Sequence, residues 1–99
     1  MNYRIELHPL AEEELSASYN WYEERSNGLG LRFITSVDKR LNEIAANPER
    51  YPKRKGKFRE TAIDIFPYVV IYEVLKKHGI IFVYHVFHTK RNPNLKYKK

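Results

Sequence analysis

The first half of the chain carries one strand pattern followed by two helical patterns. Tyr3, Ile5 and Leu7 recur at every second position, which is the period of a half-buried strand. Pro9 then ends the strand and suits the first turn of a helix. Apolar residues at helical spacing predict one helix over about residues 9–26 and a second from about Leu31 to the Asn47-Pro48 pair. Ser26-Asn27-Gly28 separates them, so we expect an antiparallel helical hairpin.

The second half carries strand patterns separated by turn residues. Residues 51–56 are predicted to form a basic loop, and residues 58–65 alternate as a strand. Phe66-Pro67 then turns the chain into two strongly apolar runs, which flank a short Lys-Lys-His-Gly turn. β-branched and aromatic runs around a glycine-containing turn favour a β-hairpin, whose second strand ends at His88.

This order of elements predicts an α+β fold. It consists of an N-terminal strand, an antiparallel helical hairpin packed on one face, and then a three-stranded antiparallel sheet. A chain of 99 residues is long enough for one modest hydrophobic core, so we expect a single domain spanning residues 1–99.

Composition narrows the class of protein. The chain has no cysteine, which excludes disulfides and thiolate chemistry and fits a reducing compartment. It also has no apolar run near the roughly 20 residues that a membrane helix needs, and its N-terminus does not resemble a signal segment. We therefore expect a cytoplasmic protein that does not contact a membrane.

The net charge of +6 is unevenly distributed. The first 30 residues hold two basic and six acidic side chains, whereas the rest of the chain holds sixteen basic and six acidic ones. Such a distribution suits an anionic partner, either a nucleic acid backbone or an acidic protein segment, and the alternative is a solvated loop with a solubilising tail. The residues that we expect to bind nucleic acid or an acidic partner are Lys53, Arg54, Lys55, Lys57, Lys90, Tyr72 and Tyr97.

Several motifs together resemble the RelE/ParE superfamily of bacterial toxins. They run over nearly the whole chain and comprise His8-Pro9-x-Ala11-x-x-Glu14-Leu15, Trp21-Tyr22-Glu23, Gly28-Leu29-Gly30 with Phe33, Asn47-Pro48, Tyr51-Pro52, Phe66-Pro67-Tyr68 with Ile71-Tyr72, Val86-Phe87-His88 and Arg91-Asn92-Pro93. The resemblance implies the toxin of a type II toxin-antitoxin pair, of the kind called plasmid stabilisation proteins. It also implies an antitoxin partner, whose extended or helical segment wraps the toxin in a hetero-oligomer.

The resemblance leaves the mechanism open, because the superfamily has branches that act in different ways. One branch of the superfamily cleaves mRNA, commonly on the ribosome, and another poisons DNA gyrase. The nuclease branch carries cations at places where this chain has Glu60, Ala62 and Val69, although Arg91 and Tyr97 match that branch. The sequence therefore favours a ParE-like inhibitor of gyrase. The alternatives are a RelE-like mRNA endonuclease and an inactive remnant that only binds its antitoxin, so whether the chain is an enzyme stays open.

If the chain cleaves RNA, the candidate catalytic residues are His88, Arg91 and Arg59. Cleavage without a metal needs an acid or base and cations that face the charge on phosphorus. Histidine titrates near neutral pH, and arginine can hold two phosphate oxygens. The alternative for His88 is a cap that hydrogen-bonds to local backbone at the strand end.

No metal or cofactor is expected. His85 and His88 have a spacing that would suit a metal on a helix, but residues three apart on a regular strand point to opposite faces. We therefore expect His85 to pack on the sheet face against the helices. Trp21 and Tyr22 are adjacent on the first helix, so one should pack on the sheet while the other lies at the helix edge.

Overall fold

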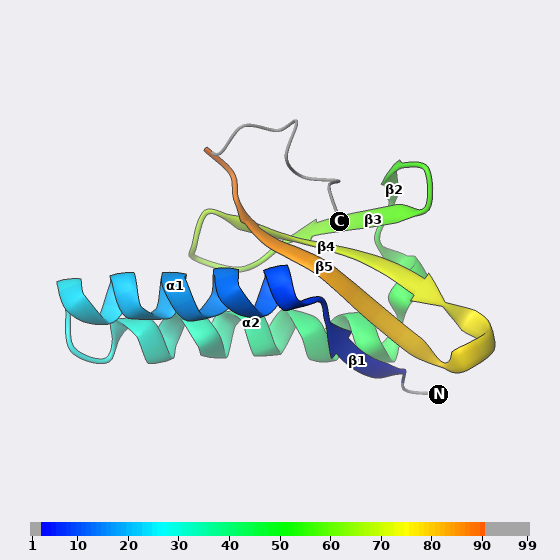
Figure 1. Cartoon of the computed structure of the whole chain (residues 1–99). Helices are drawn as coiled ribbons and strands as arrows, with labels where there is room; N and C mark the ends of the chain where they lie inside the picture. Colours follow the sequence, from blue (N-terminus) through cyan, green and yellow to red (C-terminus); the bar gives the residue numbers. More distant parts are fainter. Residues whose placement is uncertain (1–2, 91–99) are drawn as a thin grey trace.

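The computed structural model describes residues 3–90, and Figure 1 shows two helices lying along one face of a twisted sheet. The elements in chain order are strand β1 (Arg4–Leu7), helix α1 (Pro9–Arg25), helix α2 (Leu29–Ala46), the 3₁₀ turn η1 (Pro48–Arg50), strands β2 (Lys53–Lys55), β3 (Phe58–Ala62) and β4 (Tyr68–Leu75), the 3₁₀ turn η2 (Lys76–His78) and strand β5 (Ile80–His88). The predicted α+β class and the helical hairpin are confirmed. No helix in the described range is both long and apolar enough to span a bilayer.

The sheet has five strands and is mixed. Its strand order is β1-β5-β4-β3-β2. The three expected strands β3, β4 and β5 pair antiparallel, whereas β1 pairs parallel with β5 at the edge of the same sheet. Parallel pairing needs a long connection, which the rest of the fold between β1 and β5 supplies. The basic loop of the prediction contains a further short edge strand, β2, which pairs with β3.

The helical hairpin is closed by a tight junction between α1 and α2. Gly28 has a φ of 86°, a left-handed conformation that glycine adopts without steric cost. At Gly30, an added Cβ would lie 2.6 Å from the Glu23 side chain and 2.7 Å from the Tyr19 carbonyl oxygen. The Gly30 amide also donates to Glu23 Oε1 at 2.8 Å. The two helices can therefore pack this closely only with glycine at that position.

The two faces of the sheet carry separate apolar clusters. Val70, Tyr72, Ile81 and Val83 pack with residues of both helices in the larger cluster, which is the main core. The second cluster contains only strand residues, from the opposite face: Phe58, Val69, Ile71, Phe82, Tyr84 and Phe87. Strands with apolar side chains on both faces explain the continuous apolar runs of the second half of the sequence.

An irregularity in β5 changes which way its histidines point. Ile71 pairs with His85 and Tyr72 pairs with Val83, so Tyr84 is an extra residue opposite β4. Such a bulge shifts the alternation of side chains along the strand. His85 therefore lies opposite Ile71, and its ring is 6.2 Å from that of Phe87, both in the second apolar cluster, instead of packing on the helix-facing side as a regular strand would place it. Its Nδ1 nevertheless lies 3.2 Å from Glu14 on α1. His88 lies beyond the bulge, opposite Tyr68.

Candidate functional sites

His88 lies in a groove between α1 and the end of β5. Two adjoining hollows of about 320 and 340 Å³ share Ala17, Ser18, Tyr68 and His88. One hollow extends along α1 to Glu13 and Glu14, and the other extends to Trp21 and Tyr22. We refer to this combined feature as the His88 groove.

The described residues that line the groove around His88 are neutral or acidic. The His88 Nδ1 accepts a hydrogen bond from the Lys90 amide at 3.0 Å, the local backbone contact that was the alternative to catalysis. The Tyr68 ring lies 5.0 Å from the His88 ring, and its hydroxyl donates to Ser18 Oγ at 3.0 Å. Within the described residues, the groove lining includes two glutamates and no lysine or arginine.

Glu14 fastens α1 to β5 beside this groove. Its carboxylate lies 3.2 Å from His85 Nδ1 and accepts a hydrogen bond from the Val86 amide at 3.0 Å. The side chains of Glu14 and His85 are both largely buried. Glu14 belongs to the motif that carries the family resemblance, but its contact with His85 was not predictable because His85 lies 71 residues away in the chain.

Arg59 and Tyr72 lie near the opposite end of the sheet and hold the segment after α2. Arg59 Nη1 donates to the Tyr51 carbonyl oxygen at 2.6 Å and to the Glu49 carbonyl oxygen at 3.3 Å. Tyr72 pairs with Arg59 across the strands and donates its hydroxyl to the Pro48 carbonyl oxygen at 2.7 Å. Burial raises the pKa of Tyr72 well above its usual value.

The structure does not bring Arg59 beside His88. Arg59 pairs with Tyr72, whereas His88 pairs with Tyr68, four residues earlier in β4. Arg59 and His88 are therefore separated by four residues along the strands, about 13 Å, and by two strand spacings across the sheet, about 10 Å. The third catalytic candidate, Arg91, and the binding candidate Tyr97 lie outside the described residues.

Four of the remaining binding candidates, Lys53, Arg54, Lys55 and Lys57, lie in a basic edge around β2. We define the basic edge as Lys53, Arg54, Lys55, Lys57, Arg59 and Lys76. The three residues of β2 are all exposed. A small cleft of about 130 Å³ is lined by Lys53, Lys57, Arg59 and Lys76 together with Glu49 and Glu73. Lys57 pairs with Glu73 at 3.4 Å and Lys76 with Glu49 at 3.2 Å, so carboxylates offset part of this positive charge. Lys90 is exposed, one residue beyond the Thr89 that follows β5.

Trp21 and Tyr22 divide between surface and core as expected. The Tyr22 ring packs against Phe33 and Phe66 at 5.3 and 5.0 Å. Trp21 is 51% exposed, and the Arg25 guanidinium lies 3.8 Å from the centre of its ring. Trp21 also lines one of the two hollows, so the exposed indole borders the His88 groove from α1.

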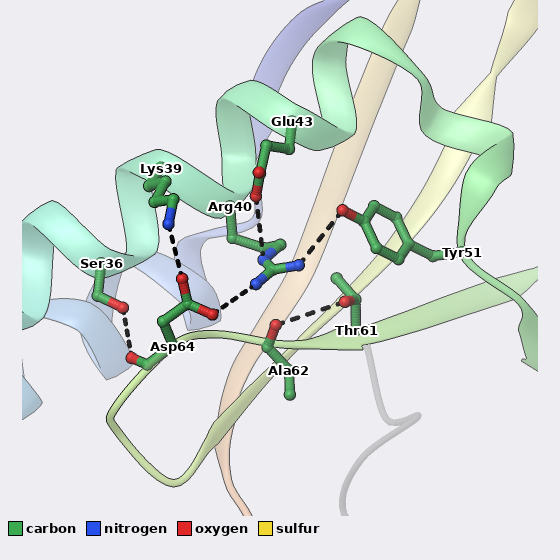
Figure 2. Close-up of polar contacts among 8 residues, drawn as sticks. All are labelled: Ser36, Lys39, Arg40, Glu43, Tyr51, Thr61, Ala62 and Asp64. Carbon is green, nitrogen blue, oxygen red and sulfur yellow. Dashed lines mark hydrogen bonds and ion pairs between the residues drawn. The ribbon is translucent and has the colours of Figure 1, made fainter.

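Asp64 forms a polar cluster with α2 that the sequence did not indicate (Figure 2). Its carboxylate accepts hydrogen bonds from Lys39 Nζ at 2.8 Å and from Arg40 Nη2 at 2.9 Å, and its carbonyl oxygen accepts one from Ser36 Oγ at 2.6 Å. The hydrogen bond and the positive charge of Lys39 lower the pKa of Asp64, and Asp64 raises that of Lys39. Arg40 Nε also pairs with Glu43 at 3.4 Å.

The fold resembles three solved structures over most of the chain. The chromosomal ParDE system of P. aeruginosa matches at 12% identity and a TM-score of 0.76, over 89% of this chain and 97% of that one. RelBE2 of Mycobacterium tuberculosis matches at 16% and 0.67, over 89% and 99%. The archaeal RelE-RelB complex of Pyrococcus horikoshii matches at 18% and 0.51, over 93% and 100%. A comparison with curated protein sequences gives no match.

A comparison of the sequence with protein-family models agrees with this fold. The family match and the fold together define the molecule as the toxin of a type II toxin-antitoxin system, within the RelE/ParE superfamily. The chain belongs to the ParE family, because the model of that family, the ParE toxin of the type II toxin-antitoxin system parDE, matches residues 5–93.

Proposed function

We propose that this toxin arrests bacterial growth by inhibiting DNA gyrase and that a cognate antitoxin neutralises it. The observation that carries the proposal is the match to the ParE family over residues 5–93. A toxin that acts on gyrase works in the cytoplasm. Because it acts by binding, the toxin needs neither a metal nor a cofactor.

The arrangement of charges supports binding over RNA cleavage. Cleavage requires an acid or base and a cation at the same phosphate. His88 has carboxylates in its groove, whereas Arg59 and the cations of β2 lie near the other end of the sheet. Carboxylates beside a phosphate raise its energy by charge repulsion. Val69, where the nuclease branch carries a cation, is buried in the second apolar cluster.

A second candidate function is mRNA cleavage. The basic edge favours it, because cations next to the aromatic side chains Tyr51 and Phe58 can hold phosphates and stack on bases. In this alternative His88 and Arg91 are the catalytic residues, while Arg59, Lys53, Arg54, Lys55, Lys57, Lys90 and Tyr97 hold the RNA. Tyr72, also a binding candidate from the sequence, is fully buried with its hydroxyl on the Pro48 carbonyl oxygen, so it cannot contact RNA.

The two functions separate when the toxin is induced in bacterial cells with and without its antitoxin. Our proposal expects growth arrest that the antitoxin relieves, altered plasmid supercoiling and uncut transcripts by primer extension. Discrete cuts that disappear in His88→Ala and Arg91→Ala would establish the endonuclease instead. Antitoxin binding without growth arrest, at confirmed expression, would show that the chain is an inactive remnant.

A further inference from the structure

Ile65 combines exposure with an unusual backbone conformation. It lies in the loop between β3 and β4, is 81% exposed and has a φ of 74°. It is the one residue other than glycine with positive φ in the described range. The Phe66 amide donates to the Asp64 carbonyl oxygen at 2.8 Å, so Ile65 is the central residue of a γ-turn. A β-branched residue with positive φ is a steric outlier.

Contacts on both sides hold Ile65 in this conformation. On the N-terminal side, Asp64 is fixed to α2 by Ser36, Lys39 and Arg40 (Figure 2). On the C-terminal side, the Phe66 ring packs 5.4 Å from Phe33 in the core. A strained backbone conformation persists only where the surrounding contacts fix it in place, as they do here.

Stability alone does not account for an isoleucine at this position. Glycine would adopt the same φ without strain, and a polar side chain would interact better with water. The exposed side chain gains little burial in the toxin itself. Strain held in place at an exposed apolar residue points to a binding role, since a preorganised side chain loses little entropy when it binds.

We propose that Ile65 is an anchor that inserts into an apolar pocket of the folded protein that this toxin inhibits. A nucleic acid is disfavoured, because the charged cluster beside Ile65 contains two cations and two carboxylates and so offers no net positive charge (Lys39, Arg40, Glu43 and Asp64). The antitoxin is also disfavoured, because an extended or helical segment places its side chains into grooves and cannot by itself enclose an isoleucine. A folded target can present such a pocket.

This inference rests on the proposed function, and Ile65→Gly tests it. The variant removes the side chain and relieves the strain, so its Tm should equal or exceed that of the wild type. We expect it to bind purified gyrase about ten- to hundredfold more weakly, which is the effect of losing one well-buried aliphatic anchor. Growth arrest should need correspondingly more toxin. Binding to its cognate antitoxin should not change.

Two further variants make the result specific. Ile65→Ala shortens the side chain and keeps the strained backbone, so it should also lose target binding. Leu31→Ala alters another exposed apolar residue, 62% exposed on α2, and should bind gyrase like the wild type.

The outcomes separate the two proposals. If wild-type toxin neither binds gyrase nor arrests growth, both proposals fail. If the wild type does both and Ile65→Gly is equally potent, only the anchor fails. Loss of antitoxin binding, or an equal loss of affinity for plasmid DNA alone, would also overturn it, by assigning Ile65 to a different partner.

Discussion

Asp64 shows how one residue positions a loop of this toxin. Its carboxylate joins two cations of α2, and its carbonyl oxygen accepts from both a helix hydroxyl and the amide that closes the γ-turn. Nothing in the sequence pattern distinguishes Asp64 from an ordinary strand residue, because its partners lie 24 to 28 residues away. The strand predicted to reach residue 65 therefore ends at Ala62.

The Asp64 contacts should make stability depend on pH in the acid range. The folded-state pKa of Asp64 lies below its ordinary value of 3.8, so its stabilising effect is present above about pH 4 and is lost as the pH falls through the folded-state pKa. We expect Asp64→Asn to be less stable than the wild type at pH 6 and equal to it at the lowest pH at which both fold. Urea unfolding across this range measures the difference, and a constant difference at all pH values would contradict this role.

At the scale of elements, the attachment of α1 to β5 depends on Glu14. The carboxylate accepts from the Val86 amide and lies against His85, and both groups are buried in the protein interior. Removal of an acceptor from buried donors costs about 1–3 kcal/mol. We therefore expect Glu14→Ala to lower the free energy of unfolding by about that amount.

Glu13→Ala is the matched control for Glu14→Ala. Glu13 precedes Glu14 on the same helix and lines the same groove, but it is exposed. Its replacement should change the free energy of unfolding by less than about 0.5 kcal/mol. Equal effects of the two substitutions in chemical denaturation would show that the Glu14 contacts do not hold the helix.

The elements with strong local signals could be predicted from the sequence. Both helices and the β4–β5 hairpin follow from apolar periodicity and from turn residues such as Gly28 and Gly79. β2 has three basic residues and no alternation, so only its pairing with β3 reveals it as a strand. The parallel pairing of β1 with β5 is equally non-local, and so is the bulge at Tyr84.

The arrangement of the candidate sites could likewise be predicted from the sequence only where it depends on local pattern. The sequence correctly placed His88 at the end of a strand, because the apolar run stops there. The distance between Arg59 and His88 depends on strand register and order, and neither is written in a local pattern. The exposed conformation of Ile65 was also not predictable, since its loop contains no glycine that would indicate positive φ.

At the scale of the whole molecule, charge should govern association with the antitoxin. The basic edge lies on a chain of net charge +6, and we expect an acidic or amphipathic antitoxin segment to contact this edge and the helices. The complex should therefore weaken as the salt concentration rises.

Arg54→Glu tests this expectation in an exposed residue of β2. We expect it to weaken the antitoxin complex at low salt and to reduce the dependence of affinity on salt. Arg32→Glu makes the same charge change at an exposed position of α2 and should have a smaller effect. Titration calorimetry at several salt concentrations compares them, and identical salt dependence in both variants and the wild type would contradict a role for the basic edge.

We propose that this ParE-family toxin acts on gyrase. The most direct measurement titrates the purified full chain into purified gyrase with relaxed plasmid and ATP, and follows supercoiling on an agarose gel. We predict that supercoiling is inhibited in proportion to toxin and is restored when the antitoxin is added. Undiminished supercoiling with toxin in excess over gyrase, from a preparation that arrests growth when induced in cells, would contradict it.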